Sequence, residues 1–184
     1  MSTAPRGSIL FRYTPGVGRV AALDCCGTTA NDATATTATA FSTSTQTMVA
    51  GTAANIAHDT VPFAYGGMTV VTGENGYFKV PTAGVYKFIP SIQYKAAGNG
   101  KFTVWIKVNG NNVSNTATLL DAPNNTQGVF TTEFLLELNA NDQVQFWGLA
   151  TSFNLDITYI PAGGSGANSY PAAPGSIVNV YRIR

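Results

Sequence analysis

His58 and Asp59 come closer to acid–base chemistry than any other residues of this chain. A histidine oriented by an aspartate can activate a nucleophile, but only where all three groups converge in space. His58 is the sole histidine and directly precedes Asp59, so in an extended strand their side chains point to opposite faces. The sequence flags no distant partner for them. We therefore predict no catalytic residue and no enzymatic activity.

Metal and cofactor motifs are equally sparse. Cys25 and Cys26 are adjacent, and because a disulfide between neighbours is strained and two thiols make no zinc site, we expect both to be reduced and structural. The nine acidic residues are scattered and form no calcium-binding loop. The segment GVGRVA at 16–21 fits a loose dinucleotide-binding pattern, but that site needs a following helix and a parallel sheet. We interpret it as a turn and predict no cofactor or metal.

Charge gives little reason to expect nucleic acid or a membrane as partner. The formal net charge is +1, so no bulk electrostatic attraction is expected. Arg6, Arg12 and Arg19 make the first 23 residues basic, and this arm either touches an acidic partner or is simply solvated. The N-terminus has no apolar core of signal-peptide length, and no stretch approaches the roughly 18 apolar residues of a membrane span. We expect synthesis in the cytoplasm, no membrane span and no nucleic-acid partner.

The composition favours contacts with other protein. Hydrophobic residues make up 45% of the chain and charged residues only 10%, whereas an ordinary domain has roughly 25% charged residues. Threonine, asparagine, serine, alanine and glycine replace the missing charges. Such a surface loses little on desolvation when it packs against another subunit.

Three regions can be separated along the chain. Residues 1–45 are predicted to form an extended arm, because the segment TTANDATATTATAFSTST has low complexity and no helical or strand period. Residues 46–184 are predicted to form one all-β domain. Within it, residues 161–175 form a Gly/Pro/Ala loop that precedes a last strand at 176–183. A long loop before the closing strand predicts that this strand crosses back into the sheet, as in a Greek-key sandwich.

Short runs of alternating apolar and polar residues, separated by Gly, Asn and Pro, predict the strands of this domain. We place them at 46–51, 60–63, 68–72, 76–80, 84–94, 101–108, 112–120, 127–138, 142–149 and 153–160. Pro90 cannot donate to a ladder, so we expect it to mark a bulge or an edge.

Alternation assigns one face of each strand to the core, and the predicted inner sets are Tyr86, Phe88, Ile92 and Tyr94; Phe102, Val104, Ile106 and Val108; Phe130, Phe134, Leu136 and Leu138; and Val144 and Phe146. Both tryptophans, Trp105 and Trp147, fall on the opposite face, together with Leu135 and Leu149. Large outward aromatics are typical anchors of subunit interfaces. The four residues are therefore a predicted subunit interface, with cover by the arm or a loop as the alternative.

Several segments resemble a known family. GYFKVPTAGVYKFIPSIQY (76–94) is similar to the opening strand pair of the complement-globular-head and tumour-necrosis-factor-like jelly rolls. WIKVNGNNV (105–113), FLLELNANDQVQFWG (134–148) and SIVNVYRI (176–183) resemble its Asn-Gly hairpin, its strand–turn–strand run and its closing strand. The positions that match are Tyr77, Phe78, Val80, Pro81, Gly84, Val85, Tyr86, Phe88, Asn109, Gly110, Asp142 and Val144.

The resemblance implies a single antiparallel jelly-roll sandwich and tight homotrimers with aromatics near the threefold contact. The extended, nearly uncharged arm and the missing secretory signal are more similar to virion components. The first hypothesis is therefore a structural virion protein: a penton or capsid-associated subunit that assembles with itself, as trimer or pentamer, and with neighbouring capsid proteins. In this hypothesis the N-terminal arm, residues 1–45, anchors the subunit by lying along its neighbours. Its expected location is the capsid. The alternative is a trimeric head that binds a host receptor or a glycan.

Overall fold

The computed structural model describes residues 10–13, 20–23 and 35–184, and the chain divides into two compact units, Met1–Ala35 and Thr36–Arg184. In the first unit, β1 (Leu10–Tyr13) pairs with β2 (Val20–Leu23) in antiparallel register. Cys25, Cys26 and most of the 16–21 segment lie outside the described residues. The anchoring role predicted for residues 1–45 likewise falls mostly on residues that are not described.

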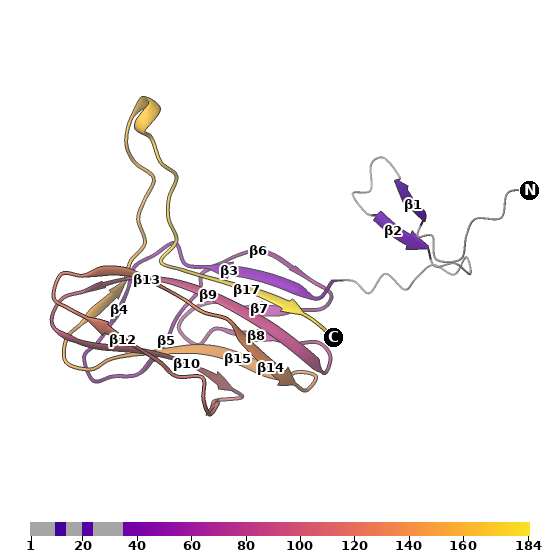
Figure 1. Cartoon of the computed structure of the whole chain (residues 1–184), viewed down its shortest axis with the longest axis horizontal. Coiled ribbons are helices and arrows are strands. Elements are labelled where there is room, and N and C mark those ends of the chain that lie inside the picture. The colour runs from indigo at the N-terminus through magenta and orange to yellow at the C-terminus, as the bar shows by residue number, and fades with distance from the viewer. Residues whose placement is uncertain (1–9, 14–19, 24–34) are drawn as a thin grey trace, which may run out of the picture. The chain divides into compact units, whose positions relative to one another are not determined.

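The second unit is a sandwich of two antiparallel sheets (Figure 1). The seven-stranded sheet contains β5 (Ala54–Asn55), β7 (Thr69–Val71), β8 (Tyr77–Lys79), β10 (Gly100–Val108), β11 (Asn111–Asn112), β12 (Thr118–Ala122) and β15 (Gln143–Ala150). The eight-stranded sheet contains β3 (Thr37–Phe41), β4 (Gln46–Met48), β6 (Thr60–Tyr65), β9 (Gly84–Ala96), β13 (Gln127–Thr131), β14 (Phe134–Leu138), β16 (Leu155–Ile157) and β17 (Ser176–Arg182). The predicted all-β jelly-roll sandwich is confirmed.

The closing strand β17 lies between β9 and β3, in the middle of its sheet. The prediction that it crosses back into the sheet is therefore correct. The segment before it rises from the sandwich as a narrow antiparallel projection, in which Ile160 pairs with Ala173 and Gly163 with Tyr170 (Figure 1). The short 3-10 helix η1 (Gly166–Asn168) lies at its tip and is the one helical element of the described residues. The described residues contain no helix that could span a membrane.

Pro90 explains why the predicted strand at 127–138 is two strands. Along β9, Val85 and Gln93 donate their backbone N–H groups toward the β17 side, so the missing N–H of Pro90 faces β13 and β14. The ladder with β13 ends at Ser91 and the ladder with β14 begins at Phe88, in an unchanged register. Pro90 therefore marks an interruption of the neighbouring strand, and the expectation of a bulge or an edge was wrong.

Two strands of the second unit escaped the sequence analysis. β3 lies inside the segment predicted to be a structureless arm, and it pairs with both β17 and β6. Its core positions Ala38 and Ala40 are completely buried although they are small, so the strand carries no large apolar side chains that would produce a pattern. β5 has only two residues. The domain accordingly begins at Thr36 and not at residue 46. The predicted strand at 112–120 is also broken, into β11 and β12.

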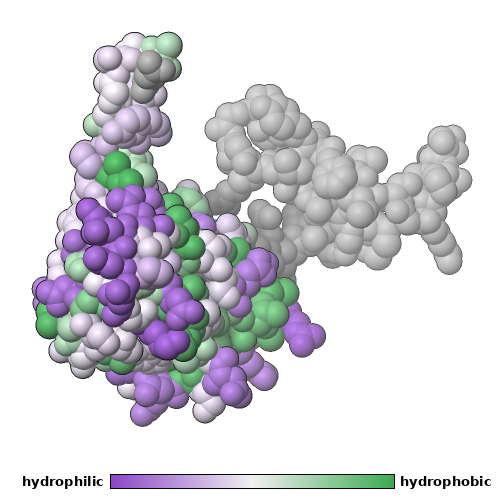
Figure 2. Space-filling view, turned by 60° about the vertical axis from the view of Figure 1, so that its left-hand side comes forward, coloured by the Kyte–Doolittle hydropathy of each residue, from purple (hydrophilic) through white to green (hydrophobic). Residues whose placement is uncertain are grey.

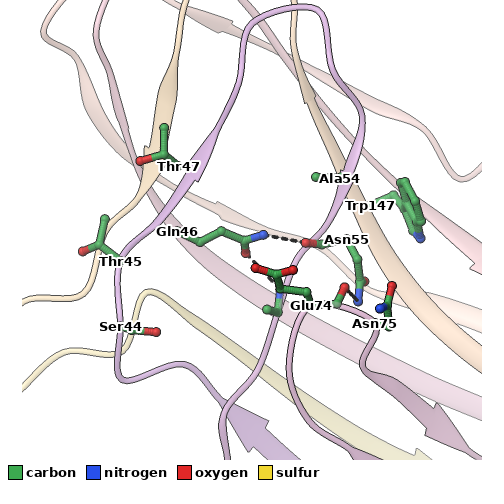
Figure 3. A pocket seen from close by; sticks show the side chains of 10 residues that line it. Ser44, Thr45, Gln46, Thr47, Ala54, Asn55, Glu74, Asn75 and Trp147 are labelled. Atoms are coloured by element: carbon green, nitrogen blue, oxygen red, sulfur yellow. Dashed lines mark hydrogen bonds between the residues drawn. The ribbon is translucent and has the colours of Figure 1, made fainter.

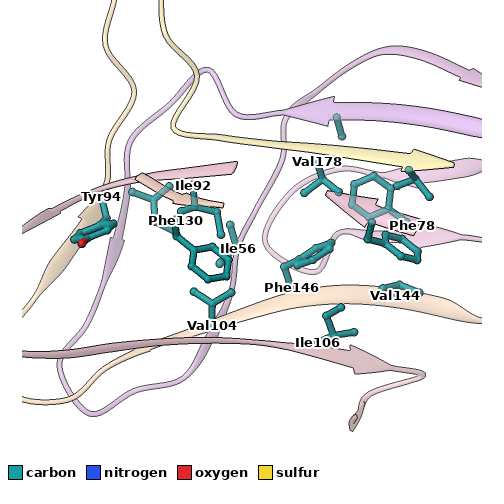
Figure 4. Packing of buried hydrophobic residues seen from close by; sticks show 14 of the residues in the cluster. Ile56, Phe78, Ile92, Tyr94, Val104, Ile106, Phe130, Val144, Phe146 and Val178 are labelled. Carbon is teal, nitrogen blue, oxygen red and sulfur yellow. The ribbon is translucent and has the colours of Figure 1, made fainter. Parts of the chain in front are cut away.

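The core between the sheets is built from the predicted inner faces, and its central contacts are aromatic (Figure 4). Phe146 of the seven-stranded sheet lies 6.2 Å from Phe78 and 6.1 Å from Phe88, measured between ring centroids. Phe78 and Phe88 meet edge to face at 6.3 Å. Phe88 belongs to the opposite sheet, so this cluster joins the two layers.

The position of β3 gives a prediction about truncation. A chain that begins at Thr36 should keep the sandwich and melt within about 5 °C of the full chain, since all ladders of the second unit remain. A chain that begins at Gln46 should not fold, because it loses β3, which is the partner of both β17 and β6. Circular dichroism during thermal unfolding of both chains measures this. A cooperative transition of equal midpoint in the shorter chain would contradict the assignment of β3 to the domain.

Candidate functional site

The two tryptophans are direct cross-strand partners. Trp105 of β10 faces Trp147 of β15 in the antiparallel ladder, and their ring centroids are 6.4 Å apart with an interplanar angle of 36°. Their neighbours Val104, Ile106 and Phe146 are buried in the core, so both indoles lie on the outer face of the seven-stranded sheet. The prediction that they share one outer face is confirmed. Both are half-buried.

Polar neighbours fix the two rings. The indole N–H of Trp105 donates to Asn112 Oδ1 at 2.8 Å. The ammonium of Lys107 lies 3.4 Å from the ring centroid of Trp147, a cation–π contact. Both indoles are thus oriented by groups of the same sheet and do not depend on another chain for their position.

The structure separates the four predicted interface residues. Leu149 is the cross-strand partner of Thr103 and lies on the tryptophan face. Leu135 belongs to β14 of the other sheet, where it pairs with Lys87 and is 64% exposed. The predicted grouping of Leu135 with the tryptophans was therefore wrong. Strand alternation gives the face within one sheet but not the sheet to which a strand belongs.

A hollow opens beside Trp147, with a volume of about 610 Å³ (Figure 3). Trp147 lies at one side of it and the segment Ser44–Thr47 at the other, with the turn that carries Glu74 and Asn75 between them (Figure 3). The lining residues are Ser44, Thr45, Gln46, Thr47, Ala54, Asn55, Ala57, Glu74, Asn75 and Trp147. Six of the ten lining residues carry a hydroxyl or an amide, Glu74 carries a carboxylate, and Ala54, Ala57 and Trp147 are apolar.

Hydrogen bonds hold the walls of this hollow. Gln46 spans them, because its amide donates to the carbonyl of Asn55 at 2.7 Å and accepts from the N–H of Ala57 at 2.9 Å. Asn55 donates through its side-chain nitrogen to the carbonyls of Glu74 at 3.0 Å and Gly76 at 2.9 Å. Side chains therefore join β4, β5 and the turn that carries Glu74 and Asn75, and these hydrogen bonds maintain the shape of the hollow.

Asp59 fixes the start of the same wall. Its carboxylate accepts from the N–H and hydroxyl of Thr43 and from the hydroxyls of Ser44 and Thr60, at 2.8 to 3.1 Å. Desolvation raises the pKa of Asp59, but the backbone N–H of Thr43 and the three hydroxyls outweigh it and lower that pKa below its ordinary value. Asp59 thus stays ionised and has a structural role in the turn before β4.

His58 is a core residue. It is 6% exposed and packs edge to face on Phe78 at 5.7 Å between ring centroids. Its Nε2 has no hydrogen-bond partner among the described residues, and the carboxylate of Asp59 points to the hydroxyls of its own turn. Burial lowers the pKa of His58 to about 4, against a smaller opposing effect of Asp59. The two residues do not form an acid–base pair.

The residues that carry the family resemblance hold the frame. Phe78, Tyr86 and Phe88 are core side chains, and the hydroxyl of Tyr86 donates to the carbonyl of Thr82 at 2.8 Å. Pro81 follows β8, and Gly84 has no room for a side chain because the carbonyl oxygen of Arg184 lies against it. Asn109 and Gly110 form the β10–β11 turn with positive φ values of 51° and 80°.

Asn109 and Asp142, predicted separately from two motifs, meet in the structure. The side-chain nitrogen of Asn109 donates to Asp142 Oδ1 at 2.8 Å, and its oxygen accepts from the N–H of Gln143 at 2.9 Å. The second carboxylate oxygen of Asp142 accepts from the N–H of Asn139 at 2.8 Å. This contact ties the β10–β11 turn to the β14–β15 turn.

The outer face of the eight-stranded sheet carries a second, more exposed group of large apolar residues. One row across the sheet contains Tyr65 of β6, Tyr181 of β17 and Leu135 of β14, which are 60%, 44% and 64% exposed. Phe63 stacks on Tyr65 at 5.7 Å between centroids. Val129 on β13 is 60% exposed. Figure 2 shows that the hydrophobic surface of the sandwich comes in patches and is not evenly spread. We call Phe63, Tyr65, Leu135 and Tyr181 the aromatic row.

Sequence reasoning missed the aromatic row and the polar hollow. Tyr65 and Phe63 face outward only because β6 pairs with β3, a strand without a sequence signal. Asn55 and Gln46 stand in a stretch of small and polar residues, where no spacing indicates that their amides bond to distant backbone groups.

Two packed antiparallel sheets with a late strand that returns to the sheet centre define a tumour-necrosis-factor-like jelly-roll domain. The C1q domain matches residues 40–154, more than half of the chain, and the chain belongs to this family. The family resemblance seen in the sequence is therefore confirmed. No curated protein sequence matches the chain.

Solved structures of three related proteins superpose on this chain. The globular domain of zebrafish complement 1qA protein has a TM-score of 0.52 and 15% identity, over 82% of this chain and 98% of that chain. The tumour necrosis factor Eiger from S. frugiperda has a TM-score of 0.54 and 11% identity, over 82% and 93%. Murine APRIL, solved at pH 5.0, has a TM-score of 0.51 and 8% identity, over 81% and 99%. At these identities the likeness shows the fold.

The buried His58 predicts that acid destabilises the domain. Unfolded histidine takes up a proton near pH 6.5 and folded His58 only near pH 4. Between these values the unfolded state binds more protons, so the free energy of unfolding should fall as pH is lowered from 6.5 to 4, by on the order of 3 kcal/mol. Urea unfolding at fixed protein concentration across this range measures the loss.

The variant His58→Phe keeps a ring against Phe78 and removes the titrating group, so its stability should change much less over the same range. The loss due to Asp59 has a different window, because its folded pKa is lowered and its contribution disappears only as pH falls below about 3.8. An equal loss between pH 6.5 and 4 in wild type and His58→Phe would contradict the assignment to His58.

Proposed function

We propose that the chain is a non-enzymatic recognition head that self-associates as a homotrimer through the outer face of its eight-stranded sheet. The observation that carries the proposal is the aromatic row, four large apolar side chains left at the surface of a domain that belongs to the C1q family. Large apolar side chains that gather on one exposed face mark interaction surfaces. Aromatic residues are enriched in the buried centres of such surfaces.

The charges on this face are compatible with burial. Lys87 lies between Tyr181 and Leu135 in the row, and its ammonium is paired with Glu133 at 2.7 Å. Thr39 and Asn179 lie on the same face and satisfy each other through a 2.7 Å hydrogen bond. A partner subunit would thus cover two polar pairs that are already formed, which lowers the cost of their desolvation.

A binding role is also favoured over an enzymatic one. C1q-like and tumour-necrosis-factor-like domains typically act as binding modules. Within residues 35–184, His58 is buried and does not contact the carboxylate of Asp59. The described residues contain no cluster of three or more His, Cys, Asp or Glu that could hold a metal ion.

The family and the matched structures support a binding head better than a virion role. The binding head was the alternative in the sequence analysis, and the virion role was its first hypothesis. None of the three matched structures is that of a virion protein. Only the sequence therefore supports the penton or capsid role, the capsid partners and the capsid location. The tryptophan face stays a predicted interface, now with Trp105, Trp147 and Leu149 only.

Two double variants test which face assembles. Leu135→Asp with Tyr181→Asp places charge in the aromatic row, and the mass of the protein in solution should fall from three chains to one. Leu119 of β12 pairs with Thr103 on the face of Trp105 and is 56% exposed. The matched control, Trp105→Asp with Leu119→Asp, therefore places the same charge on the outer face of the seven-stranded sheet and should leave the mass unchanged. Sedimentation velocity measures both, with circular dichroism to show that each variant is folded.

Two results would overturn the proposal. One is a monomeric wild-type protein. The other is dissociation of the Trp105→Asp, Leu119→Asp protein while the Leu135→Asp, Tyr181→Asp protein keeps its mass. The second result would instead make the tryptophan face the subunit interface.

A further inference from the structure

The hollow beside Trp147 has an acceptor without a partner. Asn55 is 6% exposed, and its Oδ1 makes no hydrogen bond to the described residues. Both N–H bonds of the same amide are used, to the carbonyls of Glu74 and Gly76. Turning the amide over would place its oxygen against those two carbonyls, so its orientation is fixed by the structure. The Oδ1 is also buried from solvent, so a hydrogen-bond donor can complete Asn55 only where the wall of the hollow moves aside.

The remaining lining limits the charge of a ligand. Glu74 is the only acidic residue among the ten lining residues, and none of them is a lysine, arginine or histidine. A phosphate, sulfate or carboxylate ligand would find no positive partner there. The hydroxyls of Ser44, Thr45 and Thr47 and the amide of Asn75 offer both donors and acceptors. The lining thus suits a neutral ligand with several hydroxyl groups.

Trp147 adds a flat apolar wall to this polar lining. On its β10 side the indole is held by Trp105 and Lys107, and on its β5 side its ladder partner is Asn55. An indole next to a buried amide acceptor presents an apolar surface and a hydrogen-bonding group side by side. A pyranose ring has the matching pair, because its C–H groups form an apolar face and its hydroxyls surround the edge.

We infer that the hollow formed by the 44–47 segment, Asn55, the Glu74–Asn75 turn and Trp147 is a binding site for a neutral saccharide. The volume of about 610 Å³ lies within the range of roughly 300 to 1,000 Å³ that small-ligand sites occupy. The inference rests on the proposed recognition role, to which it adds the ligand class and the site. It places that site between β4 of the eight-stranded sheet and β5 and β15 of the seven-stranded sheet, apart from the aromatic row.

Tryptophan fluorescence gives a direct test, because the chain has only two tryptophans. In Trp105→Phe all tryptophan emission comes from Trp147, and in Trp147→Phe it comes from Trp105. Methyl glycosides of glucose, galactose, mannose and N-acetylglucosamine are titrated one at a time into both proteins. At least one of them should change the emission of Trp105→Phe along a saturable curve and leave the emission of Trp147→Phe constant.

A variant of the amide tests the residue that carries the inference. Asn55→Leu removes the acceptor at similar volume, and in the Trp105→Phe background it should weaken saccharide binding at least tenfold. Glu74→Gln removes the only charge of the lining and should leave neutral saccharides bound. Thermal unfolding shows whether each variant is folded, and if Asn55→Leu does not fold, the two single-tryptophan proteins still decide the question.

Each remaining outcome counts against the inference. If no glycoside changes the emission of Trp105→Phe, the hollow holds solvent only. If both single-tryptophan proteins respond alike, the effect is not that of this site. Sedimentation of the same samples separates this inference from the proposed function. A trimer without saccharide binding refutes the site alone, whereas a monomer that binds saccharide refutes the trimeric head alone.

Discussion

The contact of Phe146 with Phe78 and Phe88 is the interaction on which the rest of this structure depends. Phe78 and Phe146 come from one sheet and Phe88 from the other, so the cluster sets the separation and the register of the two layers. Burial of three phenyl rings outweighs any single hydrogen bond of the domain. His58 closes one side of the cluster and is kept neutral by the same burial, which explains why a histidine next to an aspartate has no chemistry to perform here.

A filled core leaves the alternate residues of every strand for the two outer faces, and these faces differ. The eight-stranded sheet presents large and strongly exposed rings, Tyr65 and Tyr181 among them. The seven-stranded sheet presents half-buried indoles that are already held by Asn112 and Lys107. An exposed apolar ring gains free energy when another surface covers it, whereas an indole fixed by its neighbours is a preorganised wall for a small ligand. Assembly and recognition can therefore occupy separate parts of one sandwich.

The polar hollow exists because of connections and not because of the sheets themselves. Gln46, Asn55 and Asp59 each bond to backbone groups of another segment, and together they hold the turn before β4, the strand β5 and the turn after β7 at fixed positions. Side-chain amides and carboxylates satisfy here the backbone groups that short strands leave unpaired. The low charge of the chain follows the same logic, because most polar surface is supplied by groups that can be buried without a counter-ion.

By itself the sequence determined the class of fold, the inner face of each long strand and the shared face of Trp105 and Trp147, since a period of two places alternate residues on opposite sides whatever the partners are. It also determined the turn at Asn109–Gly110, because positive φ values favour these residues. Only the tertiary structure decided that Leu135 and Trp147 belong to different sheets, that Pro90 divides 127–138 into two strands, and that Ala38 and Ala40 form a core strand. These facts depend on which strands pair, and pairing is set by contacts between residues far apart in the chain. The site at Asn55 could not be predicted for the same reason. Nothing in the sequence indicates that its amide donates to the carbonyls of Glu74 and Gly76.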